Sequence, residues 1–322
     1  MVELVTFGDA SLQFVPHGHE RLETAREARL HVAGTESGAA VAANALGGAP
    51  TWVSALPDSP LGRQVEGQLR QHGIDTAITW VDPGETRQGI VFRETGKPPR
   101  EDEVWHDREN TPLTSASPGD FPMDRIQTAD ALFTGLSTPV LSEQAARTTA
   151  AMLRAAHGSG VTTAVDIDYQ PGFRSAERYR EVLHALVEHV DVLVVNQDHA
   201  REVLEESGQA RELANVIAAE HDLEMIVITR GGCDAVVLHD TPGTNVMYER
   251  EAADIDPVDT TGQHAAFSGG FLRSLVAGDE LAEALSYGVA SAALSRTIPG
   301  PLLTATDDEV EHVVANVVES SR

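Results

Sequence analysis

Short apolar runs alternate with longer, partly polar segments along most of this chain. Residues 2–7 form one apolar run, which ends in Gly8-Asp9 and is typical of a buried strand followed by a turn. Residues 36–46 are rich in alanine and end at Gly47-Gly48, a glycine stop that is typical of a helix. Such alternation predicts a doubly wound α/β fold, in which helices cover both faces of a mostly parallel sheet.

The individual elements follow from the same pattern. We expect strands at residues 2–7, 51–56, 129–133, 161–167, 192–195 and 225–229. We expect helices at residues 36–46, 60–72, 142–157, 177–190, 198–206, 210–221, 262–276, 281–296 and 307–317. No internal repeat or linker is visible, so residues 1–322 are expected to form a single domain.

Two pairs of segments depart from the alternation. Residues 77–81 and 89–93 look like two strands around the turn Asp82-Pro83-Gly84, and a charged loop follows them. We therefore expect an insertion that pairs strands outside the main layer. Residues 235–238 and 245–248 predict a second pair, an antiparallel edge of the main sheet.

Composition excludes several classes of protein. The 322 residues contain one cysteine, Cys233, which rules out a disulfide scaffold or a zinc finger. No run of about 20 apolar residues is present, so no membrane span is expected. The first residues lack the basic region of a signal peptide, and we expect a cytoplasmic protein.

The formal net charge is −27, and Lys97 is the only lysine. Such a chain repels nucleic-acid phosphates and anionic membranes, so neither is expected as a partner. Scattered carboxylates with almost no lysine favour adaptation to a very salty cytoplasm, where ions screen the self-repulsion. An ordinary acidic protein from a GC-rich genome is the alternative.

Polar residues follow several of the expected strands. Asp9, Asp166, Asp168, Asn196 and the segment 229–231 stand where strands end. In open parallel sheets, ligands bind beyond the carboxyl ends of the strands, so these residues indicate a cleft. Taken singly, each is equally typical of a helix cap or a turn.

The most informative segment is Asp259-Thr260-Thr261-Gly262, which leads from a strand into a helix. Free backbone N–H groups and the helix dipole favour an anion at such a helix start. An ordinary loop with Thr261 as the helix N-cap is the alternative.

With this segment, the chain resembles the ribokinase/PfkB family of sugar kinases and, within it, the 2-keto-3-deoxygluconate kinase branch. The resemblance runs along nearly the whole chain, through residues 5–9, 33–37, 56–62, 166–169, 190–193, 227–231, 259–262 and 267–272. It implies a ribokinase-like core with a small β-sheet lid at about residues 10–32 and 76–108. It also implies ATP with Mg²⁺, a sugar or sugar-acid substrate, and a homodimer formed through the lid.

The resemblance implies site residues as well. Substrate contacts would involve Asp9, Gly34, Gly38, Asp166 and Asp168, and nucleotide contacts Asn196, Thr229, Gly231, Thr261 and Gly262. The family motif Asp-Thr-x-Gly-Ala-Gly-Asp supplies an anion hole and a carboxylate that takes the proton from the sugar hydroxyl. No set of metal-ligating side chains is expected, because a lone histidine such as His199 is not a metal site.

This chain departs from the family at the catalytic motif. Gln263-His264-Ala265 stands where Ala-Gly-Asp belongs, so Ala265 occupies the position of the proton acceptor and His264 that of a glycine. Further departures are Ala33 and Gly38 in the early glycine motif, Gln170 for an arginine, His199 for a glutamate and Asp234 for a glycine.

Three functions remain open at this point. The first is an ATP-dependent sugar or sugar-acid kinase with an altered site and slow or unusual phosphoryl transfer, for which His264 is one candidate substitute for the base. The second is an inactive kinase-fold protein that binds sugar or nucleotide, or pairs with an active paralogue. The third is a nucleoside kinase of the same fold.

Overall fold

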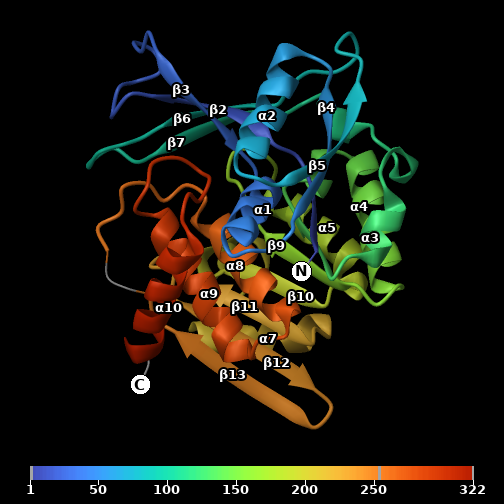
Figure 1. Cartoon of the computed structure of the whole chain (residues 1–322), viewed down its shortest axis with the longest axis vertical. Coiled ribbons are helices and arrows are strands. Elements are labelled where there is room, and N and C mark those ends of the chain that lie inside the picture. The colour runs from blue at the N-terminus through green and yellow to red at the C-terminus, as the bar shows by residue number, and fades with distance from the viewer. Residues whose placement is uncertain (1–2, 253–254, 321–322) are drawn as a thin grey trace.

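The apolar runs form the strands of one large sheet, which runs through the centre of the molecule (Figure 1). In this computed structural model, which describes residues 3–252 and 255–320, nine strands lie in the order β13-β12-β11-β10-β9-β8-β1-β4-β5. They are β1 (Leu4–Phe7), β4 (Thr51–Pro57), β5 (Asp75–Val81), β8 (Ala131–Gly135), β9 (Thr162–Ile167), β10 (Val192–Asn196), β11 (Met225–Thr229), β12 (Ala235–Thr241) and β13 (Thr244–Arg250). Neighbours from β5 to β11 pair in parallel, and β12 and β13 form the expected antiparallel edge.

The α-helices cover both faces of this sheet. They are α1 (Thr35–Ala45), α2 (Pro60–Gln71), α3 (Met123–Thr128), α4 (Glu143–His157), α5 (Ala176–Leu186), α6 (Gln197–Val203), α7 (Ala210–His221), α8 (Gln263–Ala277), α9 (Leu281–Ser295) and α10 (Asp307–Ser320). Short 3-10 turns lie at Pro112–Thr114, Pro118–Asp120, Pro139–Leu141 and Val187–His189. The described helices include none that is long and apolar enough to cross a membrane.

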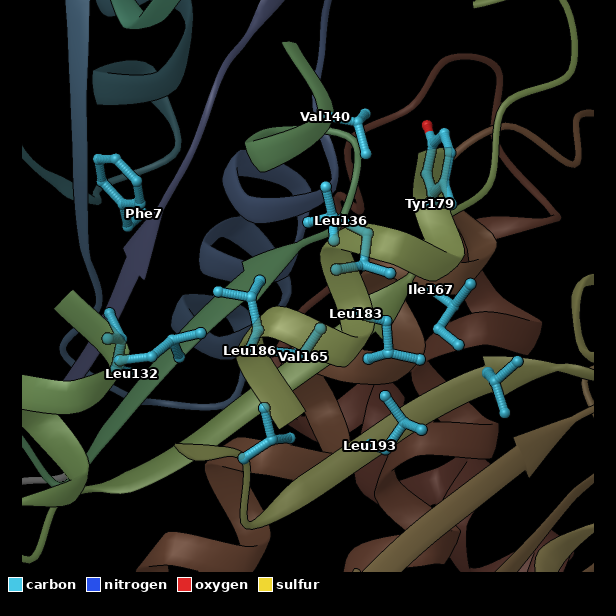
Figure 2. Packing of buried hydrophobic residues seen from close by; sticks show 14 of the residues in the cluster. Phe7, Leu132, Leu136, Val140, Val165, Ile167, Tyr179, Leu183, Leu186 and Leu193 are labelled. Carbon is cyan, nitrogen blue, oxygen red and sulfur yellow. The ribbon is translucent and has the colours of Figure 1, made fainter. Parts of the chain in front are cut away.

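The two faces have separate apolar cores. On one face, helices α4, α5 and α7 pack on the strands through residues such as Leu153, Leu183 and Leu213 (Figure 2 shows part of this cluster). On the other face, α8 and α9 pack through Phe267 and Leu285. Since the central strands are buried on both sides, their sequences are largely apolar, and this explains why the pattern predicted these strands well.

The element boundaries differ slightly from those expected. The helix expected at 177–190 ends at Leu186 and continues as a 3-10 turn, and the helix expected at 198–206 is the shorter α6. The strand expected at 129–133 is displaced by two residues, to β8. Val2, where we expected the first strand to begin, lies outside the described residues.

A second sheet of four strands, the lid, extends from one end of the molecule (Figure 1). Its order is β3-β2-β6-β7, formed by β2 (Ser11–Pro16), β3 (Ala28–Ala33), β6 (Ile90–Glu94) and β7 (Glu103–Asp107). Strand β2 pairs in parallel with β6, while the outer pairs are antiparallel.

The expected lid boundary at about residue 76 is wrong, because β5 belongs to the large sheet. Strand β5 pairs in parallel with β4, to which it is joined by α2. Its side chains are covered on both faces, since Ala77 packs against one core and Ile78 and Trp80 pack against another. The turn at Asp82-Pro83-Gly84 therefore leads from one sheet to the other rather than closing a hairpin.

Candidate active site

A cavity of about 450 Å³ is formed by the lid, the segments that follow β1 and β9, and the start of α8. This is the edge of a parallel sheet at which ligands bind. The polar residues that line it are Asp9, Ser11, Gln13, Thr35, Asp102, His106, Arg108, Ser137, Asp166, Asp168, Tyr169, Gln170, His199, Thr261 and His264.

The structure brings most of the expected site residues to this cavity and leaves others outside its lining. Asp9, Gly34, Asp166, Asp168, Thr261, Gly262, His264 and Ala265 line it. Gly38 lies just behind, where an added Cβ would come within 2.7 Å of the Ala265 Cβ. Asn196, Thr229 and Gly231 are not part of the lining.

The three outlying residues have local environments of their own. The Asn196 side chain caps α6 by accepting a hydrogen bond from the backbone N–H of Asp198 at 2.9 Å. Thr229 ends β11, and its buried Oγ1 has no partner among the described residues. At Gly231 an added Cβ would meet no atom within 4 Å.

Arg108 crosses the cavity from the lid to the large sheet, and sequence reasoning did not single it out. Its Nε donates to Asp9 Oδ2 at 3.0 Å, and its guanidinium lies 4.5 Å from the centre of the Phe173 ring. Arg108 and Asp9 are only 5% and 3% exposed. The two residues are 99 positions apart in the chain, so no local motif predicts their pairing. The only related signal in the sequence is the charged loop that follows residues 89–93.

A second carboxylate, Asp168, is held on both of its oxygens. Oδ1 accepts from the Ser137 backbone N–H and Oδ2 from Thr35 Oγ1, each at 2.6 Å. Burial raises the pKa of Asp168, although these hydrogen bonds favour its charged form. Gly135 makes room for it, since an added Cβ there would stand 2.5 Å from the Asp168 carboxylate.

Glu36, which sequence reasoning also missed, lies fully buried at the start of α1. Its Oε1 accepts from the Gly135 backbone N–H at 3.0 Å and from Thr138 Oγ1 at 2.7 Å. Burial, reinforced by the nearby Asp168 carboxylate, raises the pKa of Glu36 to about 8. Its position at a strand-to-helix turn is typical of an ordinary first-turn acid, and this explains why the pattern did not reveal it.

Asp166 is the last residue but one of β9 and lies beneath α8. Its Oδ2 accepts a hydrogen bond from Ser268 Oγ at 3.0 Å, and the side chain is almost completely buried. Burial, and next the Asp168 carboxylate, hold the pKa of Asp166 well above its ordinary value.

The start of α8 forms an anion-binding geometry. Gly262, and not Thr261, is the N-cap, with a φ of 84°. An added Cβ at Gly262 would stand 2.1 Å from the carbonyl oxygen of Pro301, so only glycine fits this turn. The first N–H groups of a helix have no acceptor within it, and here Thr261, Gly262, His264 and Ala265 line the cavity.

Asp259 holds the loop that enters α8. Its Oδ1 accepts from Thr261 N–H at 2.9 Å and from Arg93 Nη1 at 2.8 Å, and its Oδ2 accepts from Gly300 N–H at 3.0 Å. Against the effect of burial, the hydrogen bonds from Thr261 and the charge of Arg93 lower the pKa of Asp259. Asp259 therefore shapes the loop and stays ionised.

Two histidines lie at the same end of the cavity. The ring centres of His199 and His264 are 6.0 Å apart. His199 Nδ1 lies 2.7 Å from the Ile167 carbonyl oxygen, so Nδ1 carries a proton and donates it to that oxygen. Burial, and next His199, lower the pKa of His264 to about 4, which keeps this ring neutral near pH 7.

Comparison with known proteins identifies the family. The profile described as pfkB family carbohydrate kinase matches residues 1–307. The chain belongs to the pfkB family of carbohydrate kinases. This confirms the resemblance stated from the motifs, together with the ribokinase-like fold.

Individual relatives agree with this membership. The chain is 42% identical to the 2-dehydro-3-deoxygalactonokinase of Haloferax volcanii, over 97% of this chain and 96% of that protein. It shares its fold with the 2-dehydro-3-deoxygluconokinase of Thermotoga maritima at a TM-score of 0.85, with 24% identity over 98% of this chain and 100% of that one. A ribokinase II candidate from E. coli, solved with ATP and Mg²⁺, has a TM-score of 0.85 with 16% identity over 98% of this chain and 100% of that one.

Proposed function

We propose that this PfkB-family protein transfers the γ-phosphoryl group of ATP to a hydroxyl group of a 2-keto-3-deoxy sugar acid. The observation that carries this proposal is the 42% identity to a 2-dehydro-3-deoxygalactonokinase along almost the whole of both chains. At that identity and coverage a shared class of substrate is the simplest expectation.

The charges of the cavity support an acidic sugar. Arg108 is the only arginine or lysine among the residues that line it. An arginine binds a carboxylate through two parallel hydrogen bonds, and this one is already oriented by Asp9 and the Phe173 ring. Asp166 and Asp168 offer acceptors for the sugar hydroxyl groups.

The phosphates fit the other end of the cavity. The first turn of α8, with Gly262 at its N-cap, offers unpaired backbone N–H groups to a transferring phosphoryl group. We place the nucleotide from this turn toward Asn196, Thr229 and Gly231, the residues to which the family resemblance assigns nucleotide contacts. Among the described residues, no group of three or more His, Cys, Asp or Glu could hold a metal ion, so Mg²⁺ would bind largely through the phosphates.

The test is ADP release from Mg–ATP in molar KCl, with 2-keto-3-deoxygalactonate, 2-keto-3-deoxygluconate and, as a control, a neutral sugar such as ribose. We expect turnover with the sugar acids and little with the neutral sugar. Arg108→Lys should raise KM for the acids at least tenfold, whereas Arg147→Ala, an exposed arginine on α4, should leave it unchanged. Equal turnover of acid and neutral sugars would contradict the assignment.

Ala265 supports a second candidate, an inactive kinase-fold protein that binds the sugar acid or nucleotide. Alanine accepts no proton, and loss of a general base costs about 10²–10⁴ in rate. Folded protein that binds Mg–ATP and the sugar acid in calorimetry, yet releases no ADP, would establish this candidate instead.

The homodimer through the lid is also a proposal. Trp105 of β7 is 44% exposed, and an outer lid strand with such a large apolar side chain favours a covering partner. We expect a dimer mass by light scattering and a monomer for Trp105→Glu. A monomeric wild-type protein would contradict this. The cytoplasmic location stays a prediction.

A further inference from the structure

The proposed reaction needs a proton acceptor that the family motif no longer supplies in this chain. As the sugar hydroxyl oxygen bonds to the γ-phosphorus, the bond from that phosphorus to the β,γ-bridging oxygen breaks, and ADP leaves with the electron pair. The hydroxyl proton must pass to a neighbouring group. Ala265, at the position of the family carboxylate, has no atom that can accept it.

Asp166 reaches the same part of the cavity from the opposite side. It lines the cavity, and its Oδ2 accepts from Ser268 Oγ at 3.0 Å. Ser268 and Ala265 are three residues apart on α8, so they lie one above the other on one face of the helix. The Asp166 carboxylate is therefore fixed within one helical turn of the lost carboxylate.

We propose that Asp166 is the general base of this protein, and that a carboxylate on β9 replaces the one lost from α8. This inference rests on the proposed kinase function. Asp166 takes the hydroxyl proton as the new O–P bond forms and later releases it to solvent. The Ser268 hydroxyl holds one carboxylate oxygen, and the other is left for the substrate, since no described residue donates to Oδ1.

The other nearby groups fit this role less well. Both oxygens of Asp168 already accept short hydrogen bonds, from Ser137 and Thr35. Glu36 does not line the cavity. His264 lines it, but with a pKa of about 4 its ring has little affinity for a proton.

The charges around Asp166 give the base a useful proton affinity. Asp168, on the same strand end, and Glu36, on α1, raise the pKa of Asp166 in addition to burial, while the Ser268 hydroxyl of α8 lowers it. Burial also raises the pKa of Asp168, while the positive charge of Arg108 acts on the pKa of Asp168 in the opposite direction. A base works best when its pKa lies near the working pH, and an ordinary aspartate lies well below it.

The experiment compares steady-state turnover of Mg–ATP and 2-keto-3-deoxygalactonate by the full chain and its variants. Asp166→Asn should lower kcat about 10²–10⁴-fold and change KM less than about threefold. Asp191→Asn is the matched control, because that carboxylate binds Thr163 at the other end of β9, outside the cavity; its kcat should stay within twofold of the wild type.

The decisive comparison is a variant that restores the carboxylate of the family motif at position 265. Ala265→Asp, added to Asp166→Asn, should raise kcat at least tenfold above the single variant, since it returns a proton acceptor to α8. A structural role for Asp166 predicts no such rescue. Activity of Asp166→Asn within threefold of the wild type, or a larger loss in His264→Ala than in Asp166→Asn, would overturn the proposal.

If Asp166→Asn does not fold, the Ser268→Ala variant tests the role of Asp166 instead. Removing the hydroxyl takes a hydrogen bond from the Asp166 carboxylate, so its pKa rises and the acidic limb of the kcat/KM profile moves to higher pH. An unmoved limb would overturn the proposal. Wild-type protein without any turnover would instead refute the proposed kinase function, which the same assay measures first.

Discussion

The two sides of the cavity differ in charge. The large-sheet side presents the buried carboxylates Asp9, Asp166 and Asp168, whereas the lid side presents one cation, Arg108, and one carboxylate, Asp102. Two lid arginines bridge the lid and the body: Arg108 binds Asp9 in the cavity, and Arg93, outside the cavity lining, binds Asp259. In a chain with a net charge of −27, burying carboxylates raises the free energy of the folded state unless each has a specific cationic partner. A few well-placed ion pairs therefore hold the lid to the body.

Removing Arg108 should break this arrangement most severely. Arg108→Ala leaves the buried Asp9 carboxylate without its partner, and we expect the free energy of unfolding to fall by about 3–5 kcal/mol. Urea denaturation in molar KCl measures the change.

The paired variant separates stability from binding. Asp9→Leu together with Arg108→Met replaces the ion pair by apolar side chains of similar size and should recover most of the stability. Turnover of the sugar acid should remain low, because no cation faces its carboxylate. Full recovery of turnover would show that the pair serves the fold alone.

Arg93 should have a smaller effect, since it is closer to solvent and its partners have other contacts. It binds Asp102 of the lid at 2.6 Å and Asp259 beside α8 at 2.8 Å. Arg93→Met should cost about 1.5–3 kcal/mol of unfolding free energy, the range for hydrogen bonds to charged groups. A double-mutant cycle with Asp259→Asn measures the interaction free energy between Arg93 and Asp259. Additive effects of the two substitutions would mean that this ion pair does not contribute to stability.

The buried carboxylates of the large-sheet side predict that the free energy of unfolding depends on pH. The pKa of Glu36 is about 8 in the folded protein and near 4.5 when unfolded, so the folded state holds an extra proton between these values. The free energy of unfolding should therefore fall as pH rises from about 5 to about 8. Asp166 and Asp168, with raised pKa values, act in the same direction.

Glu36→Gln should flatten this dependence by at least about 1.4 kcal/mol, the equivalent of one pKa unit. The amide keeps an oxygen for the Gly135 and Thr138 donors but does not titrate. The exposed Glu143→Gln on α4 is the control and should leave the slope unchanged. An equal slope in Glu36→Gln and wild type would place the titration elsewhere.

Most of the fold was predictable because its central strands are buried on both faces and their helices carry clear stops. Strand β5 was misplaced because residues 77–81 and 89–93 look like two paired strands around the turn Asp82-Pro83-Gly84, and only the pairing with β4 shows where β5 lies. The candidate site was predictable where residues follow strands, as with Asp166 and Asp168. Glu36 and Arg108 gave no such local signal.

The sequence by itself determined the order of most strands and helices and the family, and it predicts the loss of a proton acceptor at Ala265, because each depends on residues near one another in the chain. The tertiary structure decided which side chains meet. Arg108 reaches Asp9 across 99 residues, and Ser268 reaches Asp166 across 102. Contacts at that separation depend on how two sheets and a helix pack, and no local pattern of residues records that packing.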